Sequence, residues 1–189
     1  YFSDSRGFPG GLIDPKETAE EAARRHLATK ACVDPVKVYM EQIYTFSSID
    51  RDPRGRVVAV GYIAYVPWSE LSPEEQSDTE HAWWHPADRK TKLAYDHDEM
   101  LSVALTRIHS RISYTTLIGK LMPKEFTLTE LEKTYEVTLG HELDKRNFRK
   151  KILKLDVLKE LPRKRTGGRF RPAQLYRFAS DKVKDIEVI

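Results

Sequence analysis

The sequence contains little cysteine and no long hydrophobic run, and each shortage excludes a class of protein. Its single cysteine, Cys32, cannot form a disulfide within the chain, which indicates a reducing, cytoplasmic setting. No stretch of about 18 apolar residues occurs, so no membrane-spanning helix is expected, and no signal-peptide pattern is visible. With 189 residues, 40% hydrophobic and 32% charged, the chain predicts one large or two small globular domains.

The charges are unevenly distributed along the chain, although the net charge is only +3. Residues 120–178 contain 16 Lys and Arg against 8 Asp and Glu, so this segment carries +8 and the remainder carries −5. A mildly acidic first part and a basic second part predict two domains with different partners, at 1–113 and 114–189. A basic segment can be a solvated surface or a nucleic-acid interface, so the arrangement of its charges has to decide.

The first motif is a glycine-rich loop followed by a helical pattern, between Arg6 and Val33. Five residues separate Gly11 from Glu17, and seven separate Glu17 from Arg25. This spacing resembles the Nudix box, G-x5-E-x7-R-E-U-x-E-E-x-G-U with U apolar, a loop–helix–loop that binds nucleoside diphosphates linked to another group. The alternative is an ordinary amphipathic helix after a turn, which does not account for the glycines at this spacing.

The chain departs from the box where the family carries metal-binding glutamates, because it has His26, Thr29 and Lys30 there. These positions share one face of a helix, and three glutamates would hold Mg²⁺ through hard oxygen ligands. A soft ligand, a weak ligand and a cation cannot replace them. The remaining acids could hold a metal only loosely: Glu17, Glu20 and Glu21. We therefore predict no metal site, no cofactor and no hydrolase activity, in a pocket that binds without cleaving.

The segment after the box predicts a mixture of strands and one helix. Strands are expected at 36–46, 57–66 and 80–85, and a helix at 98–112 with Asp96 as its N-cap. The second of these strands is almost continuously apolar, which indicates a central position in a sheet. The order is similar to the second half of the Nudix fold, an α/β/α sandwich. That resemblance also implies strands ahead of the box, so we expect the first sheet to be incomplete in this sequence.

The loop at 51–56 carries three arginines beside a turn, which could hold phosphate in a bidentate manner or simply solubilise a hairpin tip. It is similar to an arginine-rich segment of ADP-ribose-type Nudix proteins, and this favours a role in ligand binding.

The basic part predicts two capped helices. Thr127 and Glu130 fit a capping box for a helix that ends near Gly140, and Asp144 caps a second helix at 145–155. An apolar stripe on the second helix lies opposite a basic cluster, as a DNA-recognition helix requires. A solvated basic surface is the alternative.

A β-hairpin should follow these helices, with strands at 157–161 and 175–178 around a basic turn at 162–172. Helix pair and hairpin together predict a winged helix whose tip approaches the DNA backbone or a minor groove; the alternative for the tip is a disordered loop. In the first turn of the second helix, Arg146 and Asn147 could read guanine and adenine. The expected DNA-binding residues are Thr127, Lys145, Arg146, Asn147, Arg149, Lys150, Arg163, Lys164, Arg165, Arg169 and Arg171.

A Nudix-like domain followed by a basic winged helix resembles the Nudix-related transcriptional regulators of NAD metabolism, the NrtR type. The resemblance rests on Gly10-Gly11, on residues 51–56 and 95–97, and on the run FTLTELEKTYEVTLGHELDKRNFRKKI. It implies a homodimeric repressor that binds a palindromic double-stranded operator and responds to ADP-ribose or a related nucleotide. The expected ligand-binding residues are Arg6, Gly10, Gly11, Glu17, Arg25, Arg54 and Arg56.

Two other functions stay open on the sequence. One is an active ADP-ribose pyrophosphatase that uses the remaining acids of the box and carries an accessory basic domain. The other is a sugar-responsive regulator of the same architecture, similar to the arabinose-responsive Nudix regulator.

Overall fold

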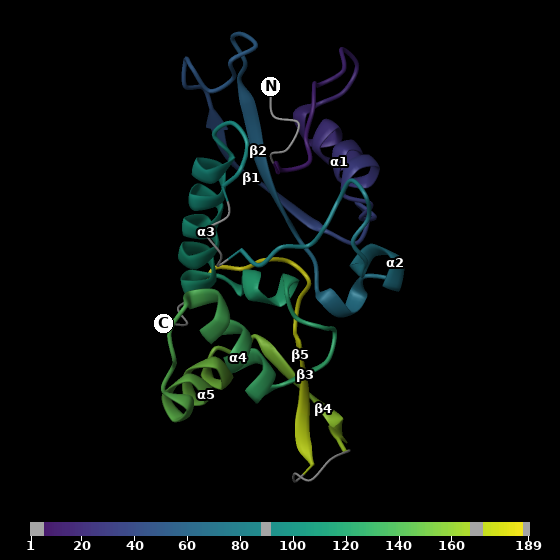
Figure 1. Ribbon diagram of the computed structural model, residues 1–189. Helices are drawn as coiled ribbons and strands as arrows, with labels where there is room; N and C mark the ends of the chain where they lie inside the picture. Colours follow the sequence, from purple (N-terminus) through teal and green to yellow (C-terminus); the bar gives the residue numbers. More distant parts are fainter. Residues whose placement is uncertain (1–5, 88–91, 167–171, 187–189) are drawn as a thin grey trace. The chain divides into compact units, whose positions relative to one another are not determined.

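The computed structural model shows two compact units (Figure 1). The residues that it describes are 6–87, 92–166 and 172–186. The first unit comprises Tyr1–Val66 and Glu70–Arg107, and the second comprises Pro67–Ser69 and Ile108–Ile189. The division falls within one helix, ahead of the boundary expected at 113/114, and the expected domain limits stay a prediction. None of the described helices is both long and apolar enough to cross a membrane.

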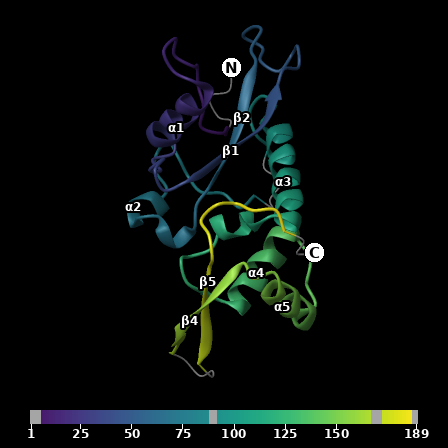
Figure 2. The same ribbon diagram turned by 180° about the vertical axis from the view of Figure 1, so that it is seen from behind.

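The first unit contains a helix, α1 (Ala19–Lys30), and an antiparallel pair of strands, β1 (Tyr39–Phe46) and β2 (Ala59–Tyr65). Helix α1 begins where Thr18 and Glu21 form a capping box. Figures 1 and 2 show α1 and a second long helix on opposite sides of the two strands, as an α/β/α sandwich requires. Both strands confirm the sequence prediction with slightly shorter limits. Among the described residues β2 pairs only with β1, so its central position stays a prediction.

The segment between β2 and the second long helix differs from the sequence prediction. It contains two short helices that were not predicted, η1 (Trp68–Glu70) and α2 (Pro73–Gln76). Residues 80–85 form no strand, so that prediction is wrong. The backbone there is held by local hydrogen bonds instead: the Thr79 hydroxyl accepts from Ala82 N at 2.9 Å. A strand needs a partner edge, which a β-rich composition alone does not supply.

Helix α3 (His97–Tyr114) confirms the helix expected at 98–112. Asp96 directly precedes it, and its carbonyl accepts from Met100 N at 3.1 Å as that of an N-cap residue does, but its side chain does not cap the helix. Its carboxylate accepts two hydrogen bonds from Arg51 instead, so its oxygens serve an ion pair rather than the helix N–H groups. One hydrophobic cluster of this unit is formed by Val33, Val38 and Leu71, against which Leu27, Ala31, Met40, Ala64 and Val66 pack.

Besides the end of α3, the second unit contains two further α-helices and a three-stranded antiparallel sheet in the order β3-β5-β4 (Figure 1). Its elements, after the short helix η2, are β3, α4, α5, β4 and β5. Their limits are Thr116–Lys120 for η2, Phe126–Thr127 for β3, Leu128–Leu139 for α4, Lys145–Lys154 for α5, Leu158–Arg165 for β4 and Ala173–Phe178 for β5. Side chains that are at most 1% exposed fill the core: Ile112, Leu117, Ile118, Phe126, Leu131, Tyr135 and Ile152.

The predicted helix caps of this unit are confirmed. The Thr127 hydroxyl accepts from Glu130 N at 3.2 Å, and the Thr127 backbone N–H donates to the Glu130 carboxylate. Gly140 ends α4 in the left-handed region, with φ of 76°. Asp144 Oδ1 accepts from Asn147 N at 2.6 Å and starts α5. Each signal lies within a few residues of sequence, which is why it could be read without the fold.

One limit in the second unit was predicted wrongly. Strand β4 continues past 161 to Arg165, so Arg163, Lys164 and Arg165 lie in a strand rather than in the tip of the hairpin. The pairing tolerates an irregularity between Glu160 and Lys164, around Pro162, which has no N–H to donate. Arg169 and Arg171 lie outside the described residues.

Replacing Gly140 by alanine should destabilise the protein by about 1 kcal/mol, because a Cβ is disfavoured in the left-handed region. Chemical denaturation measures this change. Gly140→Asn is the control and should lose less stability, since asparagine tolerates this conformation. Equal stability of the alanine and glycine proteins would show that the cap does not restrain α4.

Candidate ligand pocket and nucleic-acid interface

The three residues at the positions of the family's metal-binding glutamates, His26, Thr29 and Lys30, make hydrogen bonds to backbone carbonyls within the box. His26 is buried, and its Nε2 lies 3.2 Å from the Leu12 carbonyl oxygen. The Lys30 ammonium donates to the Gly10 carbonyl, and the Thr29 hydroxyl donates to the backbone carbonyl of the preceding turn of α1. Two of the three therefore bind the glycine-rich loop itself, which gives their face of α1 a structural role.

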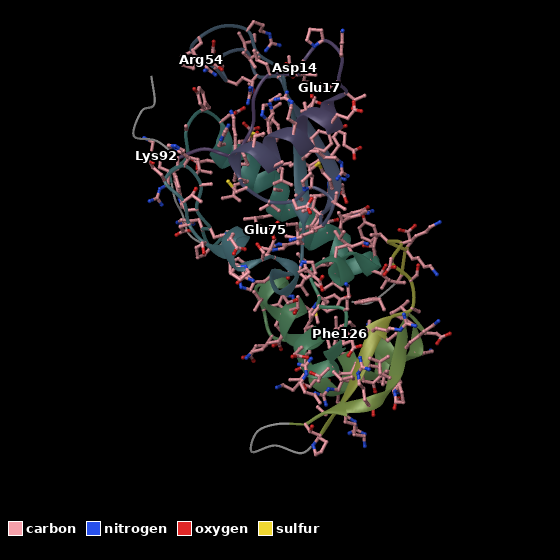
Figure 3. The ribbon with its side chains drawn as sticks, turned by 90° about the vertical axis from the view of Figure 1, so that its right-hand side faces the viewer. Asp14, Glu17, Arg54, Glu75, Lys92 and Phe126 are labelled. Atoms are coloured by element: carbon pink, nitrogen blue, oxygen red, sulfur yellow. The ribbon has the colours of Figure 1, made fainter. Side chains whose placement is uncertain are left out.

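Glu17 and Arg25 pair with each other. Arg25 Nε donates to Glu17 Oε2 at 3.0 Å, its Nη2 donates to the other carboxylate oxygen, and Nη2 also reaches the Leu12 carbonyl at 3.1 Å. These hydrogen bonds from Arg25, with one from Asp14 N, lower the pKa of Glu17 to about 2. Figure 3 labels Asp14 and Glu17 where the loop enters α1. The carboxylate stays ionised, but its charge is already balanced within the protein.

No group of three or more His, Cys, Asp or Glu side chains suited to a metal ion occurs within the described ranges.

Each arginine of the 51–56 loop has an acceptor in the protein. Arg51 is only 5% exposed and makes a bidentate contact with Asp96, at 2.8 and 2.7 Å. Arg54 donates to the Asp52 carboxylate at 2.9 and 2.7 Å, which lowers the pKa of Asp52 to about 2. Arg56 Nη1 donates to two backbone carbonyls, those of Ser47 and Ser48. Phosphate binding by Arg54 and Arg56 therefore stays a prediction.

A pocket of about 350 Å³ lies in the first unit, which is within the usual range for small-molecule sites. The guanidinium of Arg6 lies 4.8 Å from the centre of the Trp83 ring, over its face. Lys30 supplies a second cation. The remaining lining is mainly apolar and aromatic, with two histidines: Gly7, Phe8, Pro9, Ala31, His81, Ala82, Trp83, His85, Pro86, Ala87, Leu93 and Leu101.

Of the seven predicted ligand-binding residues, only Arg6 lines this pocket. The six others, which lie outside its lining, are Gly10, Gly11, Glu17, Arg25, Arg54 and Arg56. Sequence reasoning missed the contribution of Phe8 and of the segment 81–87. The available signal was the adjacent pair of tryptophans, Trp83 and Trp84, both of which are exposed.

The wall of the pocket is hydrogen-bonded to the start of α3. Ala94 N donates to the Arg6 carbonyl at 2.7 Å, and Phe8 N donates to His97 Nδ1 at 2.8 Å. The rings of Phe8 and His97 stack with centroids 5.4 Å apart, and burial lowers the pKa of His97. A ligand that moved Arg6 or Phe8 would therefore act directly on the first residues of α3.

Helix α5 separates an apolar face from a basic one. Phe148 and Ile152 are buried in the core of the unit, whereas the basic side chains are exposed or half-buried. The exposed basic side chains of α5 include Lys145, Arg146 and Lys150, and Asn147 is also exposed. Thr127 was expected to contact DNA, but its side chain is buried and its hydroxyl serves the capping box. A DNA contact of Thr127 therefore stays a prediction.

The cations of β4 fall into two groups. Arg163 forms an ion pair with Glu125, and Arg165 forms one with Glu130. Alternation along the strand places Lys164 on the opposite face, and within the described part of the chain Lys164 makes no ion pair. Of these three expected DNA contacts, Lys164 is the one whose charge is not already balanced by a carboxylate.

Comparison with known proteins agrees with a ligand pocket in the first unit and a nucleic-acid interface in the second. Residues 2–103 match the NUDIX domain, and residues 118–178 match the NrtR DNA-binding winged helix domain. An ADPR-responsive transcriptional repressor NtrR from Acinetobacter baylyi is 38% identical over 175 residues, which span 90% of this chain and 68% of the repressor. The chain belongs to the NrtR family.

Other relatives of this NrtR-family chain include one solved with DNA. The crystal structure of Shewanella oneidensis NrtR complexed with a 27mer DNA has a TM-score of 0.78 and 34% identity, covering 91% of this chain and 78% of that one. The fold class expected from the sequence, a Nudix domain followed by a winged helix, is confirmed. An ADP-ribose pyrophosphatase from Methanocaldococcus jannaschii is 32% identical over 100 residues, 53% of this chain and 57% of that enzyme.

The close packing of the glycine loop on α1 predicts different effects for its two adjacent glycines. A Cβ on Gly11 would lie 2.5 Å from His26 Cε1, so Gly11→Ala should cost about 1–3 kcal/mol of stability. A Cβ on Gly10 would meet nothing within 4 Å, so Gly10→Ala is the matched control and should be close to neutral. Denaturant titration compares them, and equal losses would refute the packing of the loop against His26.

Proposed function

We propose that this NrtR-family protein is a transcriptional repressor whose Nudix unit binds ADP-ribose and whose winged helix binds an operator. The observation that carries the proposal is the exposed basic face of α5, which lies opposite a stripe of buried side chains. That arrangement is what a recognition helix needs to enter a major groove. The names of its relatives, an ADPR-responsive repressor and an NrtR bound to DNA, support the same function.

On the DNA side, the first turn of α5 would read base edges while its lysines and Arg149 bind phosphates. Arg146 can donate two hydrogen bonds to guanine, and Asn147 can bind adenine. Lys164 in the wing would contact the backbone. Arg163 and Arg165 would contribute only if phosphate replaced their carboxylate partners. We further propose a homodimer that matches a palindromic operator by its own twofold symmetry, acting in the cytoplasm on genes of NAD metabolism.

On the ligand side, the pocket offers what a nucleoside diphosphate sugar requires. Arg6 and Lys30 would bind the pyrophosphate, and the aromatic faces of Phe8 and Trp83 would pack against the base or ribose. The other predicted arginines already have acceptors in the protein and would have to give these up to bind the ligand. Arg25 would have to exchange Glu17 for the ligand, and Arg54 and Arg56 would likewise exchange their present acceptors.

The effect of the ligand would pass through α3. Residues 6–8 line the pocket and are bonded to Leu93–His97, and α3 continues from there to Tyr114 in the second unit. A ligand shifts a conformational equilibrium only by its difference in affinity for the two states. We infer that ADP-ribose favours the arrangement with the weaker affinity for the operator.

The rival function, hydrolysis of ADP-ribose, is suggested by the similarity to the archaeal pyrophosphatase. We propose that this chain does not hydrolyse its ligand. Pyrophosphate cleavage by the box requires clustered carboxylates around a metal ion, and here His26 and Lys30 bind the loop backbone while Arg25 balances Glu17.

A turnover assay separates the two functions. The protein should bind ADP-ribose in calorimetry, yet release no AMP above the protein-free rate in the presence of Mg²⁺ or Mn²⁺. Turnover that Glu17→Gln abolishes would refute a purely sensing role, because it would assign catalysis to the box itself.

The DNA interface predicts different roles for a helix residue and a wing residue. The probes are the selected duplex, which the wild-type protein enriches from a random-sequence library, and a scrambled duplex of equal length. Arg146→Ala should reduce preference for the selected duplex about tenfold, since one base contact is lost. Lys164→Ala should weaken both duplexes about equally and lower the slope of log affinity against log salt by about 1. Full affinity of both variants would exclude this interface.

A further inference from the structure

A buried carboxylate lies beneath the basic face of α5. Glu132, on α4, is only 2% exposed. Its Oε1 lies 3.6 Å from Lys145 Nζ and its Oε2 lies 3.5 Å from Arg149 Nε. Both cations belong to α5, and both are candidate DNA contacts. Within the described ranges, Glu132 Oε2 has no hydrogen-bond partner, so the contact with Arg149 is one of charge rather than of a well-formed hydrogen bond.

Folding alone does not explain a glutamate at this position. Its neighbours on the same helix, Leu131 and Tyr135, are fully buried, so the site belongs to the core. A buried charge loses hydration that its partners rarely restore in full, and a hydrophobic residue in such a place is often as stable or more so. What the carboxylate supplies, and an apolar side chain would not, is attraction for two surface cations.

A second contact holds one of these cations from the same helix. Arg149 Nη2 donates to Thr129 Oγ1 at 2.9 Å. Thr129 and Glu132 are three residues apart on α4, whereas Lys145 and Arg149 are four apart on α5, so each pair shares one helix face. The guanidinium is therefore held at two points by α4 while the Arg149 side chain stays 43% exposed.

We propose that Glu132 is a positioning residue for sequence-specific DNA binding, which it assists by fixing Lys145 and Arg149 against α4. This role rests on the proposed function. Two cations share one carboxylate, so the cluster keeps a positive charge for phosphate. Cations fixed before binding lose less rotamer freedom when they meet phosphates in one register. Non-specific binding depends on charge in any register, so it gains nothing from this positioning.

The test compares the wild-type protein with Glu132→Gln on the selected and the scrambled duplex, by fluorescence anisotropy over a range of salt concentrations. Affinity for the selected duplex should fall about tenfold, whereas affinity for the scrambled duplex should not fall, because a negative charge has been removed. The affinity of Glu132→Gln for the scrambled duplex should also depend more steeply on salt concentration, because Lys145 and Arg149 are released from the carboxylate. A variant that merely lost stability would not show this steeper slope.

Glu142→Gln is the charge-matched control, because Glu142 is exposed in the segment before α5. It should keep the wild-type ratio of the two affinities. An unchanged ratio in Glu132→Gln, or an equal gain on both duplexes, would overturn the positioning role.

If circular dichroism shows that Glu132→Gln does not fold, a third variant tests the positioning role. Thr129→Val removes an exposed hydroxyl and frees Arg149 Nη2, so it should lower the affinity ratio without loss of folding. An unchanged ratio in this variant would overturn the proposal. If the wild-type protein enriches no sequence at all, the proposed operator binding itself fails, and the positioning role fails with it.

Discussion

The buried ion pair between Arg51 and Asp96 is the interaction on which the first unit depends. It fastens the loop between β1 and β2 to the residue that precedes α3. Loss of one partner from such a pair costs about 3–5 kcal/mol, because the other charge remains buried. The bonds that join residues 6–8 to the start of α3 need that helix start to be fixed. The Arg51–Asp96 ion pair therefore fixes the start of α3, and through it the wall of the pocket.

The residues that depart from the Nudix box pattern make hydrogen bonds that stabilise the box. In the family pattern, one face of the helix carries carboxylates that need a metal ion to balance their charge. Here the same face carries His26 and Lys30, which bind the backbone carbonyls of the glycine-rich loop directly. The opposite charges of Glu17 and Arg25 balance each other. These contacts stabilise the box without metal-binding carboxylates, which is consistent with the proposed sensing role.

What could be read from the sequence was local. Thr127, Gly140 and Asp144 act within a few residues of themselves, so the caps of α4 and α5 were predicted correctly. The supposed strand at 80–85 failed because pairing depends on a distant edge. Much of the candidate site could not be predicted from the sequence, because several of its contacts join residues that are far apart in the chain. The acceptors of Arg54 and Arg56 lie nearby, but Arg163 binds Glu125 and Phe8 binds His97 across long sequence separations. Charge alone marked these arginines as free to bind phosphate.

The most direct measurement is the affinity for the selected duplex with and without saturating ADP-ribose, at one salt concentration. A sensing role predicts that ADP-ribose weakens this affinity at least about fivefold, a typical coupling between two sites. Thermodynamic reciprocity then requires the duplex to weaken ADP-ribose binding by the same factor. Equal affinity for the duplex in both conditions, with ADP-ribose shown to be bound, would contradict it.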